Sequence, residues 1–336
     1  MTGATFTVPE IARVCRGTVH GTCKGDPGII HLLIDSRSLI HPDGCLFIAL
    51  VSERNDGHKY IPELFEKGVR NFLVSVLPQD LPSGGKQDDP YPGAAFILVE
   101  DTLKALQELG SFHRQKFGIP VIGVTGSNGK TIVKEWLFQM LNRDHKVIRS
   151  PKSYNSQVGV PLSVWKMAPD HDLAIFEAGI SKPGEMERLE AVIRPTIGIF
   201  TNIGHAHDEY FTGQRQKVEE KLRLFVHAGT LVYCSDYSLI TEALRADPAY
   251  SRLKTFTWSR KEEADLRVIS VEKRGGKSMV TAVFRSEPVS FTIPFPDEAS
   301  IENAIHCVAT LLMMGYAVAA IDPLVQALQP IAMRLE

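Results

Sequence analysis

The chain has 336 residues, with 37 Lys and Arg against 39 Asp and Glu, and its formal net charge is −2. Since a single hydrophobic core stops growing at roughly 250–300 residues, this length predicts two or more domains. The balanced charge provides no strong field for nucleic acid or an anionic membrane, which indicates small-molecule partners.

The cysteines and the amino terminus indicate a reducing compartment. Five scattered cysteines form no CxxC pair, and the first residues lack the basic start and apolar core of a secretory signal. The most apolar stretch, residues 307–321, is shorter than the roughly 20 residues that a membrane-spanning helix needs, and a buried helix is the better interpretation. The sequence therefore predicts a cytoplasmic protein without membrane insertion.

A segment rich in Pro, Gly and charge, residues 78–93, favours an exposed connection, and we expect a domain joint near it. After this segment, strand and helix patterns alternate. The expected strands are residues 95–99, 121–124, 173–176, 197–200 and 231–234; the expected helices are 103–117, one from Lys130 onward, 301–314 and 321–328. Two extended arms within 267–285, around Arg274, Gly275 and Gly276, predict a hairpin. The pattern is typical of an α/β fold with a mostly parallel sheet flanked by helices and an antiparallel edge.

A glycine-rich turn lies between the predicted strand 121–124 and the helix from Lys130. Such a turn binds phosphate through backbone N–H groups and the helix dipole. Lys130 would reach the β and γ phosphates of ATP or GTP, and the Thr131 hydroxyl would bind Mg²⁺. Val124 stands where the strict phosphate-loop pattern has its first glycine, and a turn that merely caps the helix is the alternative. The candidate nucleotide-binding residues are Thr125, Gly126, Ser127, Asn128, Gly129, Lys130 and Thr131.

Four segments together resemble the Mur ligases in order and spacing: TGSNGKT (125–131), YNSQVGVPL (154–162), EAG (177–179) and NIGHAH (202–207). The resemblance covers nearly the whole chain. It implies that ATP phosphorylates a carboxylate and that an amine attacks the acyl phosphate to form an amide. It also implies ATP and two Mg²⁺ ions as cofactors, and it places Asn155 among the substrate contacts.

The resemblance also assigns metal-binding residues. Glu177 ends a predicted strand, where a parallel sheet would deliver its carboxylate beside the phosphates as a Mg²⁺ ligand. A solvated acid at the strand end is the alternative. His207 matches a family histidine that helps to hold the second Mg²⁺, whereas His205 is disfavoured by spacing.

The resemblance assigns roles to two further residues, and each has an alternative. Lys221 falls where Mur ligases have a lysine that is carbamylated and then faces Mg²⁺, although Lys217 lies one turn away on a similar face. Asn303 ends a segment that resembles the adenine-contacting motif, in which Ala299 and Ser300 replace the usual His and Asn. Capping of the helix by Ser300 is the alternative there.

The first region contains DSR (35–37), GCLFIAL (44–50) and DGH (56–58), a series that resembles the uridine-diphosphate-binding domain of the family. The implied substrate contacts are Asp35, Ser36, Arg37, Asp56, Gly57 and His58. Turn formation is the alternative role for these short polar triplets.

NIGHAH resembles the branch of the family that adds D-alanyl-D-alanine to UDP-N-acetylmuramoyl-tripeptide. The resemblance implies an α/β substrate-binding domain over residues 1–99, a central ATP-binding domain over 100–328, and the start of an otherwise absent third domain over 329–336. We therefore expect this chain to bind its substrates without completing ligation. An amino-acid-adding Mur ligase, a ligase like folylpolyglutamate synthase, and a phosphate-loop ATPase or switch are the alternatives, and binding of a UDP compound discriminates against the last.

Overall fold

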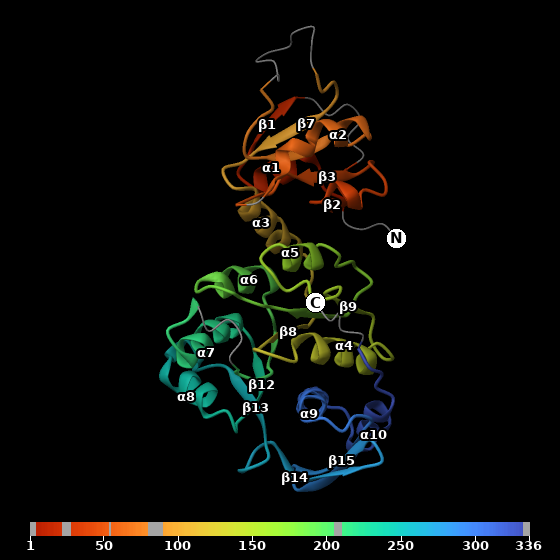
Figure 1. Ribbon diagram of the computed structural model, residues 1–336, viewed down its shortest axis with the longest axis vertical. Coiled ribbons are helices and arrows are strands. Elements are labelled where there is room, and N and C mark those ends of the chain that lie inside the picture. The colour runs from red at the N-terminus through yellow and green to blue at the C-terminus, as the bar shows by residue number, and fades with distance from the viewer. Residues whose placement is uncertain (1–4, 22–27, 54, 80–89, 205–209, 332–336) are drawn as a thin grey trace. The chain divides into compact units, whose positions relative to one another are not determined.

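The computed structural model describes residues 5–21, 28–53, 55–79, 90–204 and 210–331. The chain divides into two compact units, Met1–Phe117 with Val164–Pro169, and Gly118–Ser163 with Asp170–Glu336 (Figure 1). The division falls after Phe117, whereas the sequence placed it after residue 99. The reason is that helix α3 (Thr102–Arg114) packs on α1 (Val8–Val14) within the first unit. The linker predicted over 78–93 falls largely on residues outside the described ranges, as do residues 332–336 of the predicted third domain.

The first unit is built on a five-stranded sheet. Its strand order is β1 (Thr18–Gly21), β7 (Ala95–Leu98), β6 (Asn71–Val74), β3 (Cys45–Ile48) and β2 (His31–Leu33). Only β1 is antiparallel to its neighbour, and the other pairs are parallel. The remaining described elements are the 3-10 helices η1 (Ser36–Ser38) and η2 (Gly57–Tyr60), the short strands β4 (Val51–Ser52) and β5 (Asn55–Asp56), and α2 (Ile61–Glu66). This unit is therefore α/β, as expected.

A later segment of the chain completes the core of the first unit. The indole N–H of Trp165 donates to the Ile30 carbonyl over 2.8 Å, and the His113 ring lies 3.0 Å from the Met167 carbonyl through Nε2. Phe6 packs on Trp165 with ring centroids 4.7 Å apart. These buried contacts explain why Val164–Pro169 belongs to this unit although it follows the phosphate loop in sequence.

The second unit contains a nine-stranded sheet. Its order is β16 (Glu287–Ile293), β15 (Lys277–Phe284), β14 (Leu266–Arg274), β13 (Lys254–Ser259), β12 (Thr230–Cys234), β11 (Ile197–Phe200), β8 (Val121–Thr125), β10 (Leu173–Glu177) and β9 (Val147–Arg149). Pairs from β9 to β14 are parallel, and β14, β15 and β16 pair antiparallel. Gly275 and Gly276 both have positive φ, which the two-residue turn between β14 and β15 requires. The predicted hairpin and antiparallel edge are confirmed.

Helices cover both faces of this sheet. They are α4 (Lys130–Leu141), α5 (Gly159–Val164), α6 (Glu185–Ile193), α7 (Gln214–Leu222), α8 (Ser238–Ala246), α9 (Glu298–Met313) and α10 (Val318–Gln326), with η4 (Arg223–Phe225) and η5 (Pro248–Tyr250). Alternate residues of β8 show the two faces: Ile122 and Val124 join the core under α4 and α9, whereas Gly123 faces Pro195 and Leu224. In Figure 1, α4 and α9 lie on one side of the strands and α7 and α8 on the other. The loops at the carboxyl ends of β8, β10 and β11 therefore meet at one edge.

The apolar stretch 307–321 is a buried helix only in its first half, since α9 ends at Met313 and α10 begins at Val318. Residues 307–313 belong to α9, and its buried positions include Cys307, Val308 and Leu311. Among the described residues, no helix combines the length and apolarity that crossing a bilayer requires.

Candidate functional site

The turn between β8 and α4 has a backbone that only glycine fits at two positions. Gly126 has φ +144° and Gly129 has φ +80°, and a Cβ on either would lie about 2 Å from a neighbouring side-chain oxygen. These oxygens are Oγ1 of Thr201 and Oδ1 of Asn303. Positive φ and lack of space thus require both glycines, and the loop is closely supported by residues from distant parts of the chain.

The segment after β11 forms hydrogen bonds with the phosphate loop. The Ser127 amide donates to the Asn202 carbonyl over 2.9 Å, and the Asn128 amide donates to Oδ1 of Asn202 over 3.0 Å. The Gly204 amide donates to the Ser127 hydroxyl over 2.9 Å. Two of the loop amides expected to face phosphate are therefore engaged by Asn202.

Lys130, the first residue of α4, folds back over the loop. Its ammonium donates to the carbonyls of Gly126 and Ser127 over 3.0 and 3.1 Å. Burial lowers the pKa of Lys130, and the nearby charge of Glu177 opposes that change. A cation held this way over a glycine-rich turn is suited to bind an anionic ligand at the loop.

A second lysine reaches the same carbonyl from α7. The ammonium of Lys221 donates to the Gly126 carbonyl over 3.0 Å and is almost fully buried. Burial, with the charges of Lys130 and Lys217, lowers the pKa of Lys221 to about 7. Lys217 instead donates to the Gly204 carbonyl over 2.9 Å. Both lysines face the loop region, but it is Lys221 that lies beside Lys130.

Glu177 ends β10 in a fully buried position. Neither of its carboxylate oxygens accepts a hydrogen bond from the described residues, and burial raises its pKa. The charge of Lys134, 3.8 Å from the carboxylate, opposes that rise, as do the polar side chains of Thr131 and Asn155 beside it, although neither forms a hydrogen bond of ordinary geometry with Glu177. The alternative of a solvated acid at the strand end is wrong. Because a buried carboxylate without donors favours a cation, these residues fit a hard divalent metal such as Mg²⁺.

Apart from Glu177 and its neighbours, a metal site would show as a cluster of metal-binding side chains. No group of three His, Cys, Asp or Glu side chains gathers anywhere in the described ranges. Mg²⁺ is commonly held by one or two protein groups together with water and phosphate oxygens. His207, the predicted second histidine ligand, and its competitor His205 lie outside the described residues.

Lys134 was missed by sequence reasoning. It is fully buried, and its ammonium donates to the carbonyls of Ser150, over 2.8 Å, and Lys152. It also lies 3.1 Å from Glu135. Its position four residues after Lys130 on α4, and hence on the same helix face, is the signal that could have found it. Lys134 of α4 therefore contacts both the segment that follows β9 and Glu177 at the end of β10.

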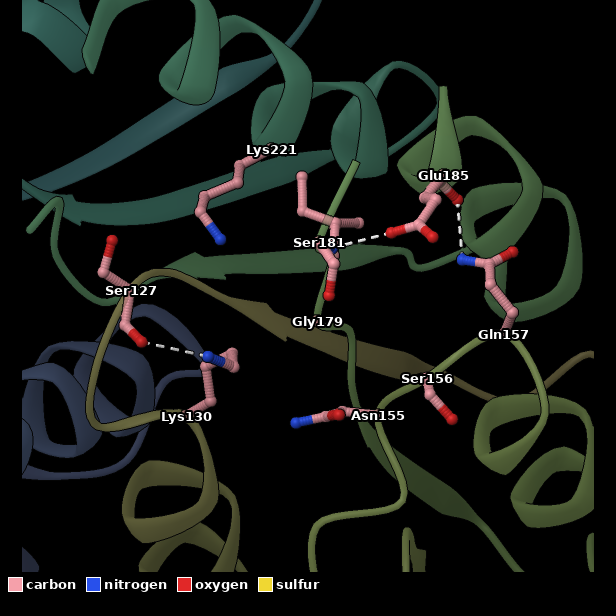
Figure 2. A pocket seen from close by; sticks show the side chains of 10 residues that line it. Ser127, Lys130, Asn155, Ser156, Gln157, Gly179, Ser181, Glu185 and Lys221 are labelled. Carbon is pink, nitrogen blue, oxygen red and sulfur yellow. Dashed lines mark hydrogen bonds between the residues drawn. The ribbon is translucent and has the colours of Figure 1, made fainter. Parts of the chain in front are cut away.

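A cavity of about 250 Å³ opens beside the loop (Figure 2). Its lining residues are Ser127, Lys130, Asn155, Ser156, Gln157, Gly179, Ile180, Ser181, Glu185 and Lys221. In Figure 2, the side chains of Lys130 and Lys221 project toward this space from opposite sides. Asn155, predicted to contact substrate, lines it too. The cavity therefore combines two lysines with uncharged hydrogen-bonding groups and one acid.

Asn303 lies on α9, almost fully buried, against the last glycine of the phosphate loop. The alternative that Ser300 caps this helix is wrong. Asp297 is the cap, and its carboxylate accepts from the Ser300 amide over 2.8 Å. The structure thus brings Asn303 to the nucleotide loop from about 170 residues away in sequence.

In the first unit, the two predicted polar triplets follow strands and form turns. Asp35 accepts from the backbone amide and the guanidinium of Arg37, which lowers the pKa of Asp35. Ser36 is buried between them. These bonds agree with the turn-forming alternative, and they leave the guanidinium of Arg37 largely exposed.

Asp56 forms a similar turn around Gly57 and accepts from both the amide and the ring of His58. Hydrogen bonding to His58 lowers the pKa of Asp56. The other ring nitrogen of His58 accepts from the Ser75 amide over 3.0 Å. His58 thereby connects this turn to the segment after β6.

Comparison with known proteins identifies the family. Residues 124–311, more than half of the chain, match the model of the Mur ligase middle domain. The chain belongs to the Mur ligase family. This Mur ligase is 30% identical over 334 residues to UDP-N-acetylmuramoyl-tripeptide–D-alanyl-D-alanine ligase of Bacillus subtilis, covering 98% of this chain and 68% of the relative. The enzyme of that name from Treponema pallidum is 31% identical, with 90% of this chain and 63% of the relative covered.

Solved structures show the same fold. The Mur ligase chain superposes on MurF from Acinetobacter baumannii with a TM-score of 0.87 at 23% identity, covering 100% of this chain and 71% of that one. MurF ligase from Thermotoga maritima, solved in complex with ADP, gives a TM-score of 0.76 at 21% identity, with 92% and 68% covered. An FPGS–AMPPCP complex gives only 0.55 at 12% identity. The α/β fold with its large, mostly parallel sheet is confirmed.

Proposed function

We propose that this Mur ligase is an ADP-forming ligase that uses ATP to join D-alanyl-D-alanine to UDP-N-acetylmuramoyl-tripeptide in peptidoglycan precursor synthesis. The observation that carries the proposal is the convergence of Lys130 and Lys221 on the Gly126 carbonyl, beside the buried carboxylate of Glu177. The names of the relatives that match 98% and 90% of this chain support the choice of substrates.

The proposed reaction has two steps, and the positive charge of Lys130 acts in the first. A carboxylate oxygen of the peptide attacks the γ-phosphorus of ATP, the bond to ADP breaks, and an acyl phosphate forms. The amine of D-alanyl-D-alanine then attacks the acyl carbon, phosphate leaves, and the amine loses a proton as the amide forms. Lys130 stabilises the negative charge that moves from the γ-phosphate to ADP. Asn202 and Thr201 hold the backbone of the loop beside this lysine.

The residues around Glu177 fit Mg²⁺, and we propose that Thr131, Glu177 and His207 contribute to holding two ions. When bound, these ions offset charge on the phosphates. The lowered pKa of Lys221 supports its carbamylation, since only the neutral amine reacts with carbon dioxide and burial makes that form abundant near pH 7. The carbamate would face the metal ions as an anion.

We assign the remaining candidates by position. Asn303 would contact the adenine of ATP, and Asn155, at the cavity, the peptide. The triplets Asp35–Arg37 and Asp56–His58 would bind the uridine diphosphate, since they follow strands in the manner of α/β ligand sites. Use of ATP and the four buried free thiols among the described residues support action in the cytoplasm.

The experiment is calorimetric titration of the purified chain with UDP-N-acetylmuramoyl-tripeptide, with and without Mg²⁺ and a nonhydrolysable ATP analogue. We expect saturable binding of both compounds. Binding of the analogue without the UDP-peptide would favour another substrate, such as that of an amino-acid-adding ligase or a folylpolyglutamate-synthase-like ligase. Absence of analogue binding would contradict the nucleotide site itself.

A further inference from the structure

A buried chain of hydrogen bonds runs beneath the phosphate loop. The indole N–H of Trp258, in β13, donates to Nδ1 of His306 in α9 over 3.1 Å. Nε2 of His306 lies 2.6 Å from the carbonyl oxygen of Thr201, after β11. His306 has no solvent-exposed surface, so each of these polar groups depends on its protein partner.

The partners of His306 determine which ring nitrogen holds the proton. An indole N–H can only donate, so Nδ1 of His306 must be the acceptor. The proton then lies on Nε2, which donates to the carbonyl of Thr201, an acceptor only. The ring is therefore neutral with one defined tautomer. The burial that lowers the pKa of His306 to about 4 agrees with this state.

Thr201 connects this chain to the phosphate loop. Its hydroxyl donates to the Asn128 carbonyl over 2.5 Å, and its amide donates to the Thr125 carbonyl over 2.9 Å. The same hydroxyl occupies the space that a side chain at Gly126 would need. A shift of Thr201 would consequently move both ends of the TGSN turn.

Helix α9 supports the loop at two points one turn apart. Asn303 meets Gly129 at the helical end of the loop, and His306, three residues later, holds Thr201 beneath its beginning. Residues three apart on a helix face the same side, so one helix face supports the whole turn.

We propose that His306 is a positioning residue for nucleotide binding, holding Thr201 and through it the phosphate loop in the shape that accepts a nucleotide phosphate. The inference rests on the proposed nucleotide site and adds a residue outside it. Within the described residues, the hydrogen bonds of the His306 ring go to Trp258 and Thr201, so its action on the loop depends on the bond from Nε2 to the Thr201 carbonyl.

The test uses two amide side chains that each replace one ring nitrogen. In His306→Gln the amide nitrogen reaches the place of Nε2, so donation to Thr201 is retained. In His306→Asn the shorter amide reaches the place of Nδ1, so the bond to Trp258 is retained and that to Thr201 is lost. Both variants exchange the ring for an amide but differ by one methylene, so the free energy of unfolding of each is measured as a control for packing.

The readout is the dissociation constant of the Mg²⁺ complex of a nonhydrolysable ATP analogue, measured by calorimetry on the full chain. We expect His306→Asn to weaken binding at least about tenfold and His306→Gln to change it by less than about threefold. Hydrogen exchange supplies a second measurement that does not depend on ligand: the amides of Ser127 and Asn128 should exchange faster in His306→Asn than in His306→Gln.

Equal nucleotide affinity and equal amide exchange in the two variants would overturn the positioning role. If the variants lose stability equally, the difference in exchange between them at the loop still decides the question, because a general loss of stability accelerates exchange across the whole unit. Failure of the unaltered chain to bind the analogue would overturn the proposed nucleotide site instead, and the inference with it.

Discussion

Lys221 of α7 and the Gly126 carbonyl of the phosphate loop lie 3.0 Å apart, and Lys130 donates to the same carbonyl at the same distance. Two ammonium groups that share one acceptor in a buried place repel each other, which favours loss of a proton. Burial, with this repulsion as the smaller cause, lowers the pKa of Lys221 to about 7. Lys221, which is far from the loop in sequence, thus loses its proton more readily beside it.

Carbamylation of Lys221 should appear in ¹³C NMR with labelled bicarbonate. Only the neutral amine reacts, and its fraction rises as the pH passes through the pKa of about 7, so a carbamate signal should grow between about pH 6 and pH 8.5. The variant Lys221→Gln is the control and should lack the signal. A signal that persists in this variant would assign the carbamate to another lysine, with Lys217 the first to examine.

The same lysine should make stability depend on pH. Its pKa is about 7 when folded and near its ordinary value of 10.5 when unfolded, so the unfolded chain binds more protons between these values. The free energy of unfolding should therefore rise with pH from about 7 to 10 in the unaltered chain relative to Lys221→Met. Parallel urea denaturation curves across this range would contradict the buried position of the ammonium.

Lys130→Ala should weaken nucleotide binding. Loss of a charged hydrogen-bond donor costs about 1.5–3 kcal/mol, which corresponds to a rise in the dissociation constant of roughly tenfold to a hundredfold. Calorimetry with a nonhydrolysable ATP analogue measures it. Lys104→Ala, which removes an exposed lysine of the first unit, should leave the affinity unchanged. Native affinity in Lys130→Ala would mean that the nucleotide binds elsewhere.

Lys134→Met should destabilise the second unit by about 3–5 kcal/mol at neutral pH, because it leaves the buried Glu177 without its nearest cation. Adding Glu177→Gln to this variant should recover part of the loss, since the buried charge is then removed. Urea denaturation of the two single variants and the double variant gives the coupling free energy. Additive losses would show that the two side chains do not interact.

Gly129→Ala should impair both folding and nucleotide binding. The added Cβ would lie 2.1 Å from Oδ1 of Asn303, and alanine disfavours the backbone angle of φ +80°. Asn303→Ala in the same chain should relieve the collision but leave a backbone cost of about 1 kcal/mol. Thermal unfolding compares the variants. Full recovery in the double variant would mean that the conformation of Gly129 costs alanine nothing.

Local patterns in the sequence determined much of this protein. Apolar runs followed by glycine and then by helical periodicity predicted the strands, the phosphate loop and α4, because backbone geometry and burial leave a period in the sequence. The two glycines at 275 and 276 predicted the hairpin because a tight turn needs residues that accept positive φ. Family motifs predicted Lys130, Glu177 and Lys221 as members of one site, and geometry brings Lys130 and Lys221 to one carbonyl.

Other features depended on contacts between distant segments. Three features leave no periodic signal: the return of residues 164–169 to the first unit, the support of the loop by Asn202, and the bond from His306 to Thr201. Each depends on which side chains meet after the sheet has assembled. The sequence by itself determined the strands, the phosphate loop, and the charged residues at their ends. Only the tertiary structure decided which buried groups shift the pKa of Lys221 and hold the loop, since desolvation and hydrogen bonding are properties of the packed neighbourhood.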